Sequence, residues 1–311
     1  MPRAVRFERY GGVEVLDVVE VDTPEPGPGE LLVRVRAAGI NPFESKLRRG
    51  LFDAQIRLHF PAAQGNDLAG VVERVGAGVS AFAIGDEVLG TSVRRGSQAE
   101  LALASETKLL RRPPALPWEV AGGLWTVATT AAAAVGAVTV AAGDVVVVAG
   151  ASGGVGSLAA QLARERGAAV VGVASERSHA WLRSHGITPV AHGDGLRQRL
   201  AAALAQAAAD GHPSALIDTA GHGYVELGVE LGIDPRRVNT IVESDAALRL
   251  GARAQGQPSG AGPDDAREIV ALLAAGRLEL PIAAVFPLAQ VRDAYALLDG
   301  GHPPGKIVLV P

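Results

Sequence analysis

The feature that most constrains this chain is an apolar run that ends in a cluster of glycines. Asp144–Ala149 reads Asp-Val-Val-Val-Val-Ala, followed by Gly150-Ala-Ser-Gly-Gly-Val-Gly156 and an alanine- and leucine-rich stretch. The continuous apolar residues predict a strand that is covered on both faces, and the stretch Val155–Arg166 predicts a helix. A strand, a glycine-rich turn and a helix in this order favour a doubly wound parallel α/β sheet.

Each glycine of this turn has its own expected role. Gly150 permits the tight exit from the strand, Gly153 leaves room for the backbone to approach a pyrophosphate, and Gly156 lets the helix pack close to the sheet. The N-terminus of the helix offers N–H groups and partial positive charge to phosphates. We therefore predict a dinucleotide site here; the alternative is a tight turn that holds no ligand.

Alternating helices and short apolar strands surround this segment. Strands are predicted at Ala169–Ala174 and Ala215–Thr219, and helices at Trp125–Val138, Ser178–His185 and Leu196–Ala209. Near the end of the chain, the patterns predict a helix at Asp264–Ala275, a strand near Ile282–Phe286, a helix at Leu288–Leu298 and a strand at Lys306–Val310.

The first third of the chain has a different texture. Leu31–Ala37 alternates with the period of two that is typical of a half-buried strand, and Asp67–Val75 and Glu87–Leu89 predict further strands. Gly and Pro residues separate them. Short strands with such turns favour a mainly antiparallel, barrel-like unit.

Composition excludes several classes of function. The chain has 311 residues, enough for two domains, and it has no cysteine, which excludes disulfides, thiolate metal sites and a cysteine nucleophile. The net charge of −4 and the lack of a dense Lys/Arg block argue against nucleic acid or a membrane surface as partner. Met1–Phe7 lacks the apolar stretch of a signal peptide, and no window has roughly 18 uninterrupted apolar residues. A cytoplasmic enzyme is expected.

The end of the strand Ala169–Ala174 bears on the choice of cofactor. An NAD site places a carboxylate there for the ribose 2′-hydroxyl, whereas a 2′-phosphate needs hydrogen-bond donors and positive charge. Ser175 and Ser178 can donate hydrogen bonds, and Arg177 can pair with a phosphate. Glu176 is expected to face solvent, because Ser175 takes the position at the strand end. NADPH is therefore favoured over NADH.

Several segments together resemble the medium-chain dehydrogenase/reductase superfamily, in its zinc-independent quinone oxidoreductase (zeta-crystallin-like) branch. The matching segments span nearly the whole chain: Ala37–Gly50 with its Asn-Pro-x-Glu-x-Lys pattern, Gly65–Gly76, Gly85–Val88, Ala149–Gly156 and Gly305–Leu309. The resemblance implies a GroES-like catalytic domain made of residues 1–118 and 257–311. A Rossmann domain that binds NADP, residues 119–256, is inserted between these pieces, and substrate and nicotinamide meet in the cleft.

The same resemblance argues against a metal and implies a dimer. Where zinc members of the superfamily have their Cys and His ligands, this chain has Asn41 and Asn66. Neutral amides are poor replacements for thiolate and imidazole, so zinc catalysis is not expected. The branch usually forms homodimers through edge pairing of the nucleotide-domain sheets, and a homodimer is therefore predicted.

The resemblance also assigns cofactor contacts residue by residue. His192 stands where the branch often has an Asn-Tyr pair, and it can substitute as a phosphate donor. Lys46 is expected to hold the nicotinamide ribose or its phosphates, with a solvated helix charge as the alternative. The full set of expected contacts is Lys46, Thr129, Ser152, Gly153, Gly154, Val155, Ser175, Arg177, Ser178, His192, Thr219, Ala220, Ile241, Val242, Gly305 and Lys306.

Hydride addition to an enone or quinone builds negative charge on the acceptor oxygen, which needs a hydrogen-bond donor. Asn41 is the candidate for this catalytic contact; the alternative is a loop residue that caps the turn before Pro42. No side chain stands out as proton donor, so water is expected to supply the proton. Asp67 is expected to accept structural hydrogen bonds, and Asp218 to cap a turn.

The function predicted from these patterns is the NADPH-dependent reduction of a quinone or an α,β-unsaturated carbonyl without a metal. Residues Leu51–Phe60 and the 244–262 loop are expected to line the substrate pocket. Two alternatives stay open: a dedicated enoyl reductase of a biosynthetic pathway, and a non-catalytic protein that binds NADPH.

Overall fold

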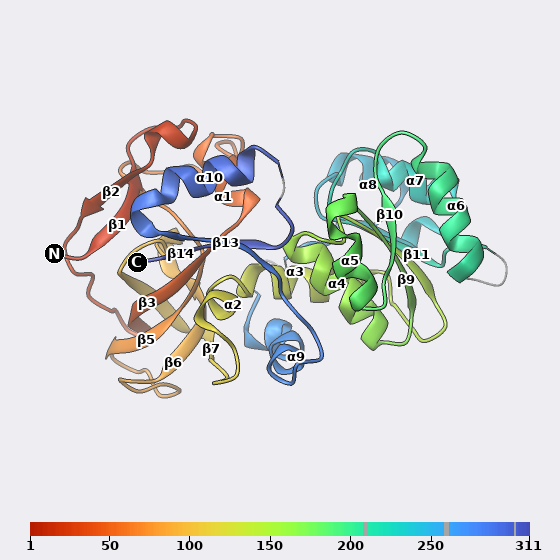
Figure 1. The fold of residues 1–311 in the computed structure, drawn as a ribbon. Coiled ribbons are helices and arrows are strands. Elements are labelled where there is room, and N and C mark those ends of the chain that lie inside the picture. The colour runs from red at the N-terminus through yellow and green to blue at the C-terminus, as the bar shows by residue number, and fades with distance from the viewer. Residues whose placement is uncertain (208–210, 258–260, 302) are drawn as a thin grey trace. The chain divides into compact units, whose positions relative to one another are not determined.

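A computed structural model describes residues 1–207, 211–257, 261–301 and 303–311 (Figure 1). The chain divides into two compact units. The first unit comprises Met1–Thr126, Gly262–Ala275 and Pro281–Pro311, and the second comprises Val127–Ala261 and Gly276–Leu280. The functional division of the chain into a catalytic and a cofactor domain remains a prediction.

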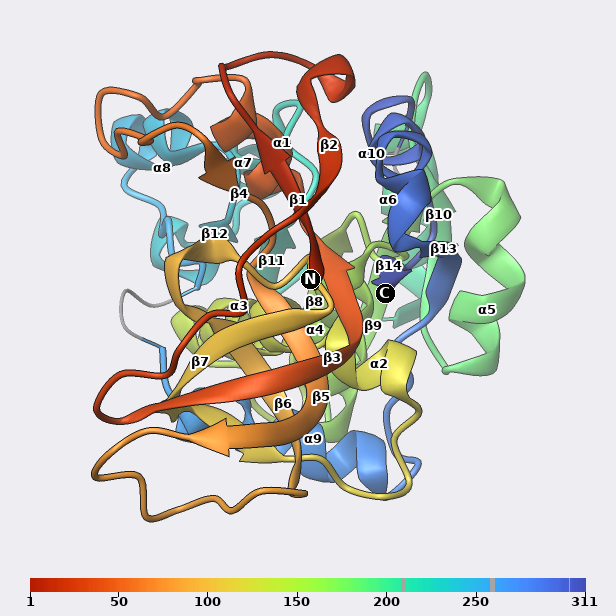
Figure 2. The same cartoon turned by 90° about the vertical axis from the view of Figure 1, so that its left-hand side faces the viewer.

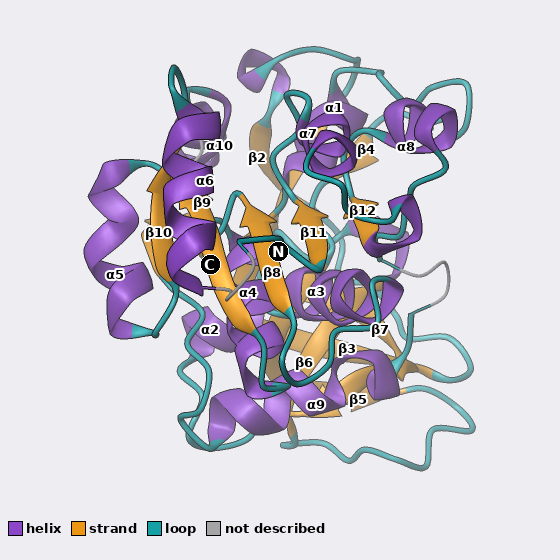
Figure 3. Ribbon diagram, turned by 90° about the vertical axis from the view of Figure 1, so that its right-hand side faces the viewer, coloured by secondary structure: helices purple, strands orange, loops and turns teal. Residues whose placement is uncertain are grey.

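The second unit is built on a five-stranded parallel sheet in the order β10-β9-β8-β11-β12 (Figure 3). The central strand, β8, is completely buried, as expected for its unbroken apolar run. The predicted doubly wound, Rossmann-type sheet is therefore confirmed. The strands are β8 Val145–Ala149, β9 Ala169–Ala174, β10 Thr188–Ala191, β11 Ala215–Asp218 and β12 Val238–Thr240.

Helices accompany these strands along the chain, and those that follow β8 contact the strands. The helices are α3 Trp125–Ala137, α4 Gly154–Glu165, α5 His179–Ser184, α6 Leu196–Ala207, α7 Tyr224–Glu230 and α8 Ser244–Leu250, with short 3₁₀ turns η3 Glu176–Ser178 and η4 Pro235–Arg237. The sequence patterns missed β10, β12, α7 and α8, because elements of three to seven residues carry little periodicity.

One expectation about this unit is wrong. The 244–262 segment was expected to be a loop, but its first seven residues form α8. Asp245 lies in the first turn of that helix and Gly251 ends it with a left-handed φ of 71°, which are ordinary start and stop signals. Residues 258–260 of the expected loop, and residues 208–209 of the helix expected to reach Ala209, lie outside the described part of the chain.

The first unit contains a six-stranded sheet in the order β13-β14-β3-β5-β6-β7 (Figure 2). Strand β7 pairs with β3 as well as β6, so β3, β5, β6 and β7 form a closed ring of antiparallel pairings. The predicted mainly antiparallel architecture of this unit is confirmed. These strands are β3 Glu30–Ile40, β5 Asp67–Val75, β6 Glu87–Ser92, β7 Leu101–Arg111, β13 Ile282–Pro287 and β14 Lys306–Val310.

A smaller sheet and four helices complete the first unit. The sheet has the order β2-β1-β4, from β1 Arg3–Phe7, β2 Asp17–Glu20 and β4 Ala62–Ala63. The helical segments are α1 Pro42–Arg48, α2 Trp118–Gly122, α9 Pro263–Ala274, α10 Val291–Asp299, η1 Val13–Val15, η2 Val93–Arg95 and η5 Leu288–Gln290. Tyr295 of α10 and Ile307 of β14 belong to one buried cluster, which joins the end of the chain to β1. None of the helices in the described ranges is long and apolar enough to cross a membrane.

Candidate functional site

The carboxyl edge of the sheet in the second unit gathers most of the predicted cofactor contacts. Because its five strands are parallel, their carboxyl ends lie at one edge. The residues that follow directly are Gly150 after β8, Ser175 after β9, His192 after β10, Thr219 after β11 and Ile241 after β12. The arrowheads of β8 and β11 point the same way in Figure 3. The fold thus brings together segments that are up to 91 residues apart in the chain.

The glycine-rich loop between β8 and α4 has the predicted geometry. Gly150 adopts a φ of +75°, and its carbonyl accepts the N–H of Gly153 at 2.9 Å. A Cβ added to Gly156 would lie only 2.1 Å from the Gly150 oxygen, so the turn and α4 approach too closely for a side chain there. The structural role expected of Gly156 is confirmed.

Gly153 differs from Gly156 because the fold itself leaves space around it. The atom nearest to a Cβ added at Gly153 is the Gly150 oxygen at 3.4 Å, an ordinary contact. Helix α4 begins at Gly154 with no side-chain cap, and the first-turn N–H groups of a helix have no partner within it. Residues Ser152–Val155 are partly exposed. The loop therefore has an open backbone, of the kind that accommodates a phosphate.

The turn after β9 offers hydrogen-bond donors. Arg177 is exposed and Ser175 is partly exposed, whereas Ser178 is buried at 3% exposure. The Ser178 Oγ has no hydrogen-bond partner among the residues that the structure describes. Such an unused buried hydroxyl is costly unless something else binds it. Glu176 is exposed, as expected.

The turn after β11 is held by a buried carboxylate. Asp218 Oδ1 accepts the N–H groups of Ala220 at 2.9 Å and Gly221 at 2.8 Å, and its Oδ2 accepts the Thr240 hydroxyl at 2.7 Å. The expectation that Asp218 caps this turn is confirmed. The Thr219 hydroxyl donates to the Ala149 carbonyl at 2.7 Å, so β11 is tied to the start of the glycine loop.

The remaining predicted contacts of the second unit differ in exposure. His192 and Val242 are exposed, and Ala220 and Ile241 are partly exposed. Thr129 lies in the middle of α3 and is completely buried, so its hydroxyl presents no surface in this arrangement. The cofactor contact of Thr129 stays a prediction.

The first unit contains a second group of polar residues, centred on Asn41, which is only 3% exposed. Asn41 precedes α1, and its backbone N–H donates to Glu44 Oε2 at 3.0 Å. Its side-chain Nδ2 donates to Glu44 Oε1 at 3.2 Å and to Asp67 Oδ2 at 3.1 Å. Its Oδ1 accepts from Lys306 Nζ at 2.7 Å. We call Asn41, Glu44, Asp67 and Lys306 the buried polar cluster.

These contacts bear directly on the two readings of Asn41. Both amide N–H groups and the amide oxygen are engaged within the protein, so a contact with an acceptor oxygen would require Asn41 to release Glu44 or Asp67. The alternative reading, a residue that caps the turn before Pro42, describes the geometry present. The catalytic role of Asn41 stays a prediction, and it requires that the Asn41 amide first release one of these carboxylates.

Three other predicted contacts, Lys46, Gly305 and Lys306, lie in the first unit. Lys46 is exposed on α1, whereas Lys306 is buried and points its amine at Ile40 O and Asn41 Oδ1. Gly305 has a φ of +107°, and a Cβ there would lie 2.2 Å from the Pro281 oxygen. The backbone therefore requires glycine at position 305, independently of any cofactor. The side chain of Lys306 is engaged in hydrogen bonds within the protein.

Sequence reasoning missed Glu44 and Tyr295. The Tyr295 hydroxyl donates to Glu44 Oε2 at 2.9 Å and accepts from Gln64 and Gln98, both at 2.8 Å. The guanidinium of Arg48 stacks on the Tyr295 ring, 4.6 Å from its centroid. A signal for Glu44 was present, because a carboxylate three residues after a helix-capping residue is a known start pattern. No local sequence pattern indicates that Tyr295 belongs to this group.

Burial dominates the ionisation of these groups. It raises the pKa of Glu44, with the charge of Asp67 acting in the same direction, and it raises the pKa of Asp67 against the attraction of Lys306. Burial also lowers the pKa of Lys306 and raises the pKa of Tyr295 well above its usual range. Tyr295 therefore stays a neutral phenol that can donate to Glu44. Asp67 accepts from Thr126 N at 3.1 Å, and thus has the structural role expected.

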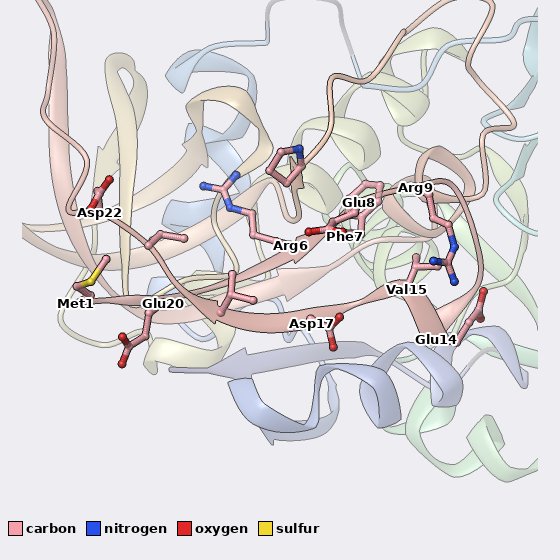
Figure 4. Close-up of a pocket in the computed structure, with 13 residues that line it drawn as sticks. Met1, Arg6, Phe7, Glu8, Arg9, Glu14, Val15, Asp17, Glu20 and Asp22 are labelled. Carbon is pink, nitrogen blue, oxygen red and sulfur yellow. The ribbon is translucent and has the colours of Figure 1, made fainter.

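An open groove of about 810 Å³ runs along β1 and β2 of the first unit (Figure 4). None of the predicted site residues lines it. Its charged lining is mostly acidic: Arg6 and Arg9 are accompanied by Glu8, Glu14, Asp17, Glu20 and Asp22. This mixed surface carries no evident chemistry.

Comparisons with known proteins agree with this fold. Residues 27–135 match the family described as "Alcohol dehydrogenase GroES-like domain", and residues 212–309 match "Zinc-binding dehydrogenase". The chain is 38% identical over 174 residues to the human "Quinone oxidoreductase", covering 55% of this chain and 52% of that protein. With the Pseudomonas aeruginosa "Quinone oxidoreductase" it shares 34% identity over 188 residues, 60% of this chain and 57% of that one. The matches thus span about half the length of these curated relatives.

Solved structures give a likeness over the full chain. The quinone oxidoreductase from Coxiella burnetii superposes with a TM-score of 0.86 at 27% identity, covering 100% of this chain and 99% of that one. A structure described as "NAD-dependent alcohol dehydrogenase" also has a TM-score of 0.86, at 26% identity, with 99% of both chains covered.

Proposed function

Because the chain belongs to the medium-chain dehydrogenase/reductase superfamily as a protein of the quinone oxidoreductase type, we propose that it is an NADPH-dependent reductase of quinones or α,β-unsaturated carbonyls. When bound, the dihydronicotinamide supplies a hydride to the acceptor. The reaction needs no metal ion in this proposal, since the chain has no cysteine and carries Asn41 and Asn66 at the matching ligand positions.

The open glycine loop is the observation that carries the proposal. Its backbone leaves space at Gly153 that the fold does not use, next to the uncapped N-terminus of α4. Ser152–Val155 would hold the pyrophosphate through backbone N–H groups. Thr219, Ala220, Ile241 and Val242 follow strands that end at the same edge and would contact the rest of the cofactor.

NADPH is proposed over NADH because of the turn after β9. A 2′-phosphate placed beside Ser175 and Arg177 would receive a hydroxyl donor and a guanidinium charge. The Ser178 hydroxyl, which has no partner in the described ranges of the chain, is a third donor. His192, exposed after β10, would add a further donor to the phosphates, and the cofactor contact expected of Lys46 stays a prediction.

Cofactor oxidation tests the activity. The purified chain is mixed with NADPH or NADH and a panel of quinones and enones, and the loss of reduced-nicotinamide absorbance is followed. We expect turnover with NADPH and at least one acceptor class. Tight NADPH binding without turnover on any acceptor would favour a non-catalytic binding protein, and turnover restricted to one enoyl substrate would favour a dedicated biosynthetic reductase. The absence of binding to either cofactor would refute the proposal.

We also propose that the protein works as a homodimer in the cytoplasm on small-molecule substrates, without nucleic-acid or membrane partners. One sheet edge of the second unit is partly occupied: Arg253 N donates to Val238 O at 2.8 Å, and Thr240 N donates to Arg253 O at 3.0 Å. A partner strand on that side would therefore pair with the segment at Arg253 instead of β12. Light scattering at micromolar concentration tests the dimer, and a monomer would count against it.

A further inference from the structure

Lys306 buries a positive charge in the first unit. Its side chain is 4% exposed, and Nζ donates to Ile40 O and Asn41 Oδ1, both at 2.7 Å. The same atom lies 3.9 Å from Asp67 Oδ2. An ammonium has three donors and no acceptor, so its three neighbours here are all groups that suit a cation.

The two carboxylates of the cluster are surrounded by donors. Glu44 accepts from the N–H groups of Asn41 and Asn66 and from the Tyr295 hydroxyl. Asp67 accepts from Thr126 through its N–H and its hydroxyl, and from Asn41 Nδ2. Because every one of these partners donates, the arrangement suits two ionised carboxylates.

The Asn41 amide links these charges. Its oxygen faces Lys306 and its nitrogen faces both carboxylates, so the neighbours define which way the amide points. Further charged groups lie beyond Tyr295: Arg48 stacks on its ring and approaches Asp299 at 3.7 Å, and Asp299 also pairs with Arg49. Within the described residues of the cluster, one ammonium therefore serves two buried carboxylates.

The residues present do not fit a zinc ion. One matching family is described as "Zinc-binding dehydrogenase", and one structural neighbour is a "cobalt and zinc bound thermostable alcohol dehydrogenase from Pyrobaculum aerophilum". Within the described ranges, however, no three His, Cys, Asp or Glu side chains are grouped so as to hold a metal. The oxygen of Asn41 faces an ammonium, and a divalent cation beside it would be repelled.

We propose that the Lys306 ammonium is a built-in cation, which partly offsets the charges of Asp67, close to Nζ, and of Glu44, linked to it through the Asn41 amide, and which takes the electrostatic role of a metal ion in this chain. The resulting assembly holds the turn between β3 and α1. This proposal does not depend on the reaction proposed above.

The first test removes the charge and keeps the length of the side chain. K306M is compared with K46M, which removes an exposed lysine from α1, by urea denaturation at pH 8 and pH 5. Removing one partner of a buried ion pair is expected to lower the folding equilibrium constant of K306M by roughly a hundredfold or more at pH 8, with little change in K46M.

The pH dependence separates charge from packing. Without Lys306, the pKa of Asp67 and of Glu44 would lie above the already raised values of the wild type. The folded variant then takes up protons more readily than the unfolded chain as the pH falls, so its deficit against the wild type shrinks between pH 8 and pH 5. A deficit that is the same at both pH values would indicate lost packing alone and would overturn the proposal.

A second variant keeps the test decisive if K306M does not fold. K306M/D67N removes the anion together with the cation, and it is expected to be more stable than K306M at pH 8. A double variant no more stable than K306M would overturn the proposal.

Zinc binding gives an independent test of the proposal. We expect zinc chloride and EDTA to leave the wild-type unfolding midpoint unchanged, or to shift the midpoints of wild type and D67N equally. Stabilisation by zinc that D67N abolishes would also overturn it.

Discussion

The carboxyl edge of the second unit and the buried polar cluster of the first unit are both rich in hydrogen-bonding groups, but they use them in opposite ways. In the cluster, the Asn41 amide engages both of its N–H groups and its oxygen with protein partners. At the edge, Ser178 Oγ has no partner among the described residues, and α4 begins without a side-chain cap. Because an unsatisfied polar group costs free energy, we expect a bound ligand to stabilise the edge more than the cluster.

This contrast changes how the two sets of predicted residues are understood. Residues at the edge were predicted from the glycine motif, the turn after β9 and the resemblance, and the Ser178 hydroxyl among them has no partner within the described residues. Asn41 and Lys306 were chosen by resemblance, and their side chains bind each other. Hydrogen-bond donors without a protein partner are expected at a ligand-binding site, whereas donors that are all paired are expected where side chains stabilise a turn. Substitutions in each region can test this distinction.

The largest expected effect is that of Gly156→Ala. The added Cβ would lie 2.1 Å from the Gly150 oxygen, and only a backbone shift can relieve that contact. We expect a loss of about 3 kcal/mol in the free energy of unfolding, together with the loss of cofactor binding. Gly136→Ala is the control, because a Cβ there meets nothing within 4 Å and Ala favours the helix. Urea denaturation measures both; equal stability of the two variants would contradict the close approach.

Tyr295→Phe tests the cluster and should cost about 2 kcal/mol of stability at neutral pH. It removes a donor from Glu44 and takes away the acceptor of one hydrogen bond from Gln64 and one from Gln98, which keeps its bond to Glu44. With one donor fewer, the pKa of Glu44 in the folded protein rises further. As the pH falls, the folded variant therefore takes up a proton before the unfolded chain does, and its loss of stability relative to the wild type becomes smaller.

The matched control for that variant is Tyr10→Phe. The Tyr10 hydroxyl donates to Asp53 at the surface, where water can replace the lost bond, so a smaller and pH-independent loss is expected. Chemical denaturation at two pH values measures all three proteins. A loss for Tyr295→Phe that does not exceed the loss for Tyr10→Phe would contradict the view that the cluster is closed.

Arg177→Ala tests whether the edge binds the 2′-phosphate of NADPH. Loss of a charged hydrogen bond to a 2′-phosphate is expected to weaken NADPH binding by roughly 1.5 kcal/mol, more than tenfold, and to leave NADH nearly unchanged. Arg183→Ala, which removes another exposed arginine from α5, is the control. Fluorescence titration with both cofactors gives the answer, and equal weakening of NADPH and NADH would refute the phosphate role.

Gly153→Ala has the smallest expected effect and the most specific one. Its Cβ would meet only the Gly150 oxygen at 3.4 Å, so stability should change by less than about 0.5 kcal/mol. NADPH affinity should fall by roughly fivefold, about 1 kcal/mol, because the methyl group occupies the space meant for the pyrophosphate. A variant that binds NADPH as tightly as the wild type would show that the pyrophosphate does not occupy the space at Gly153.

Much of the fold was predictable because its signals are local. The unbroken valines of β8, the glycines of the loop and the alternation in β3 act through neighbours in the chain, and the strand, the turn into α4 and the second strand that they predicted are present. Parallel pairing then placed the segments after five strands at one edge. The short strands β10 and β12 escaped prediction, since three or four residues cannot establish a period.

The amino-acid sequence by itself determined the open glycine loop, because turn geometry and the absence of side chains are properties of consecutive residues. Only the tertiary structure decided that Lys306 meets Asn41, 265 residues away, and that Tyr295 meets Glu44, 251 residues away. Those contacts depend on β14 pairing with β3 and on α10 packing beside α1. Pairing of distant segments selects partners by the register and burial of the whole sheet, which no short stretch of residues encodes.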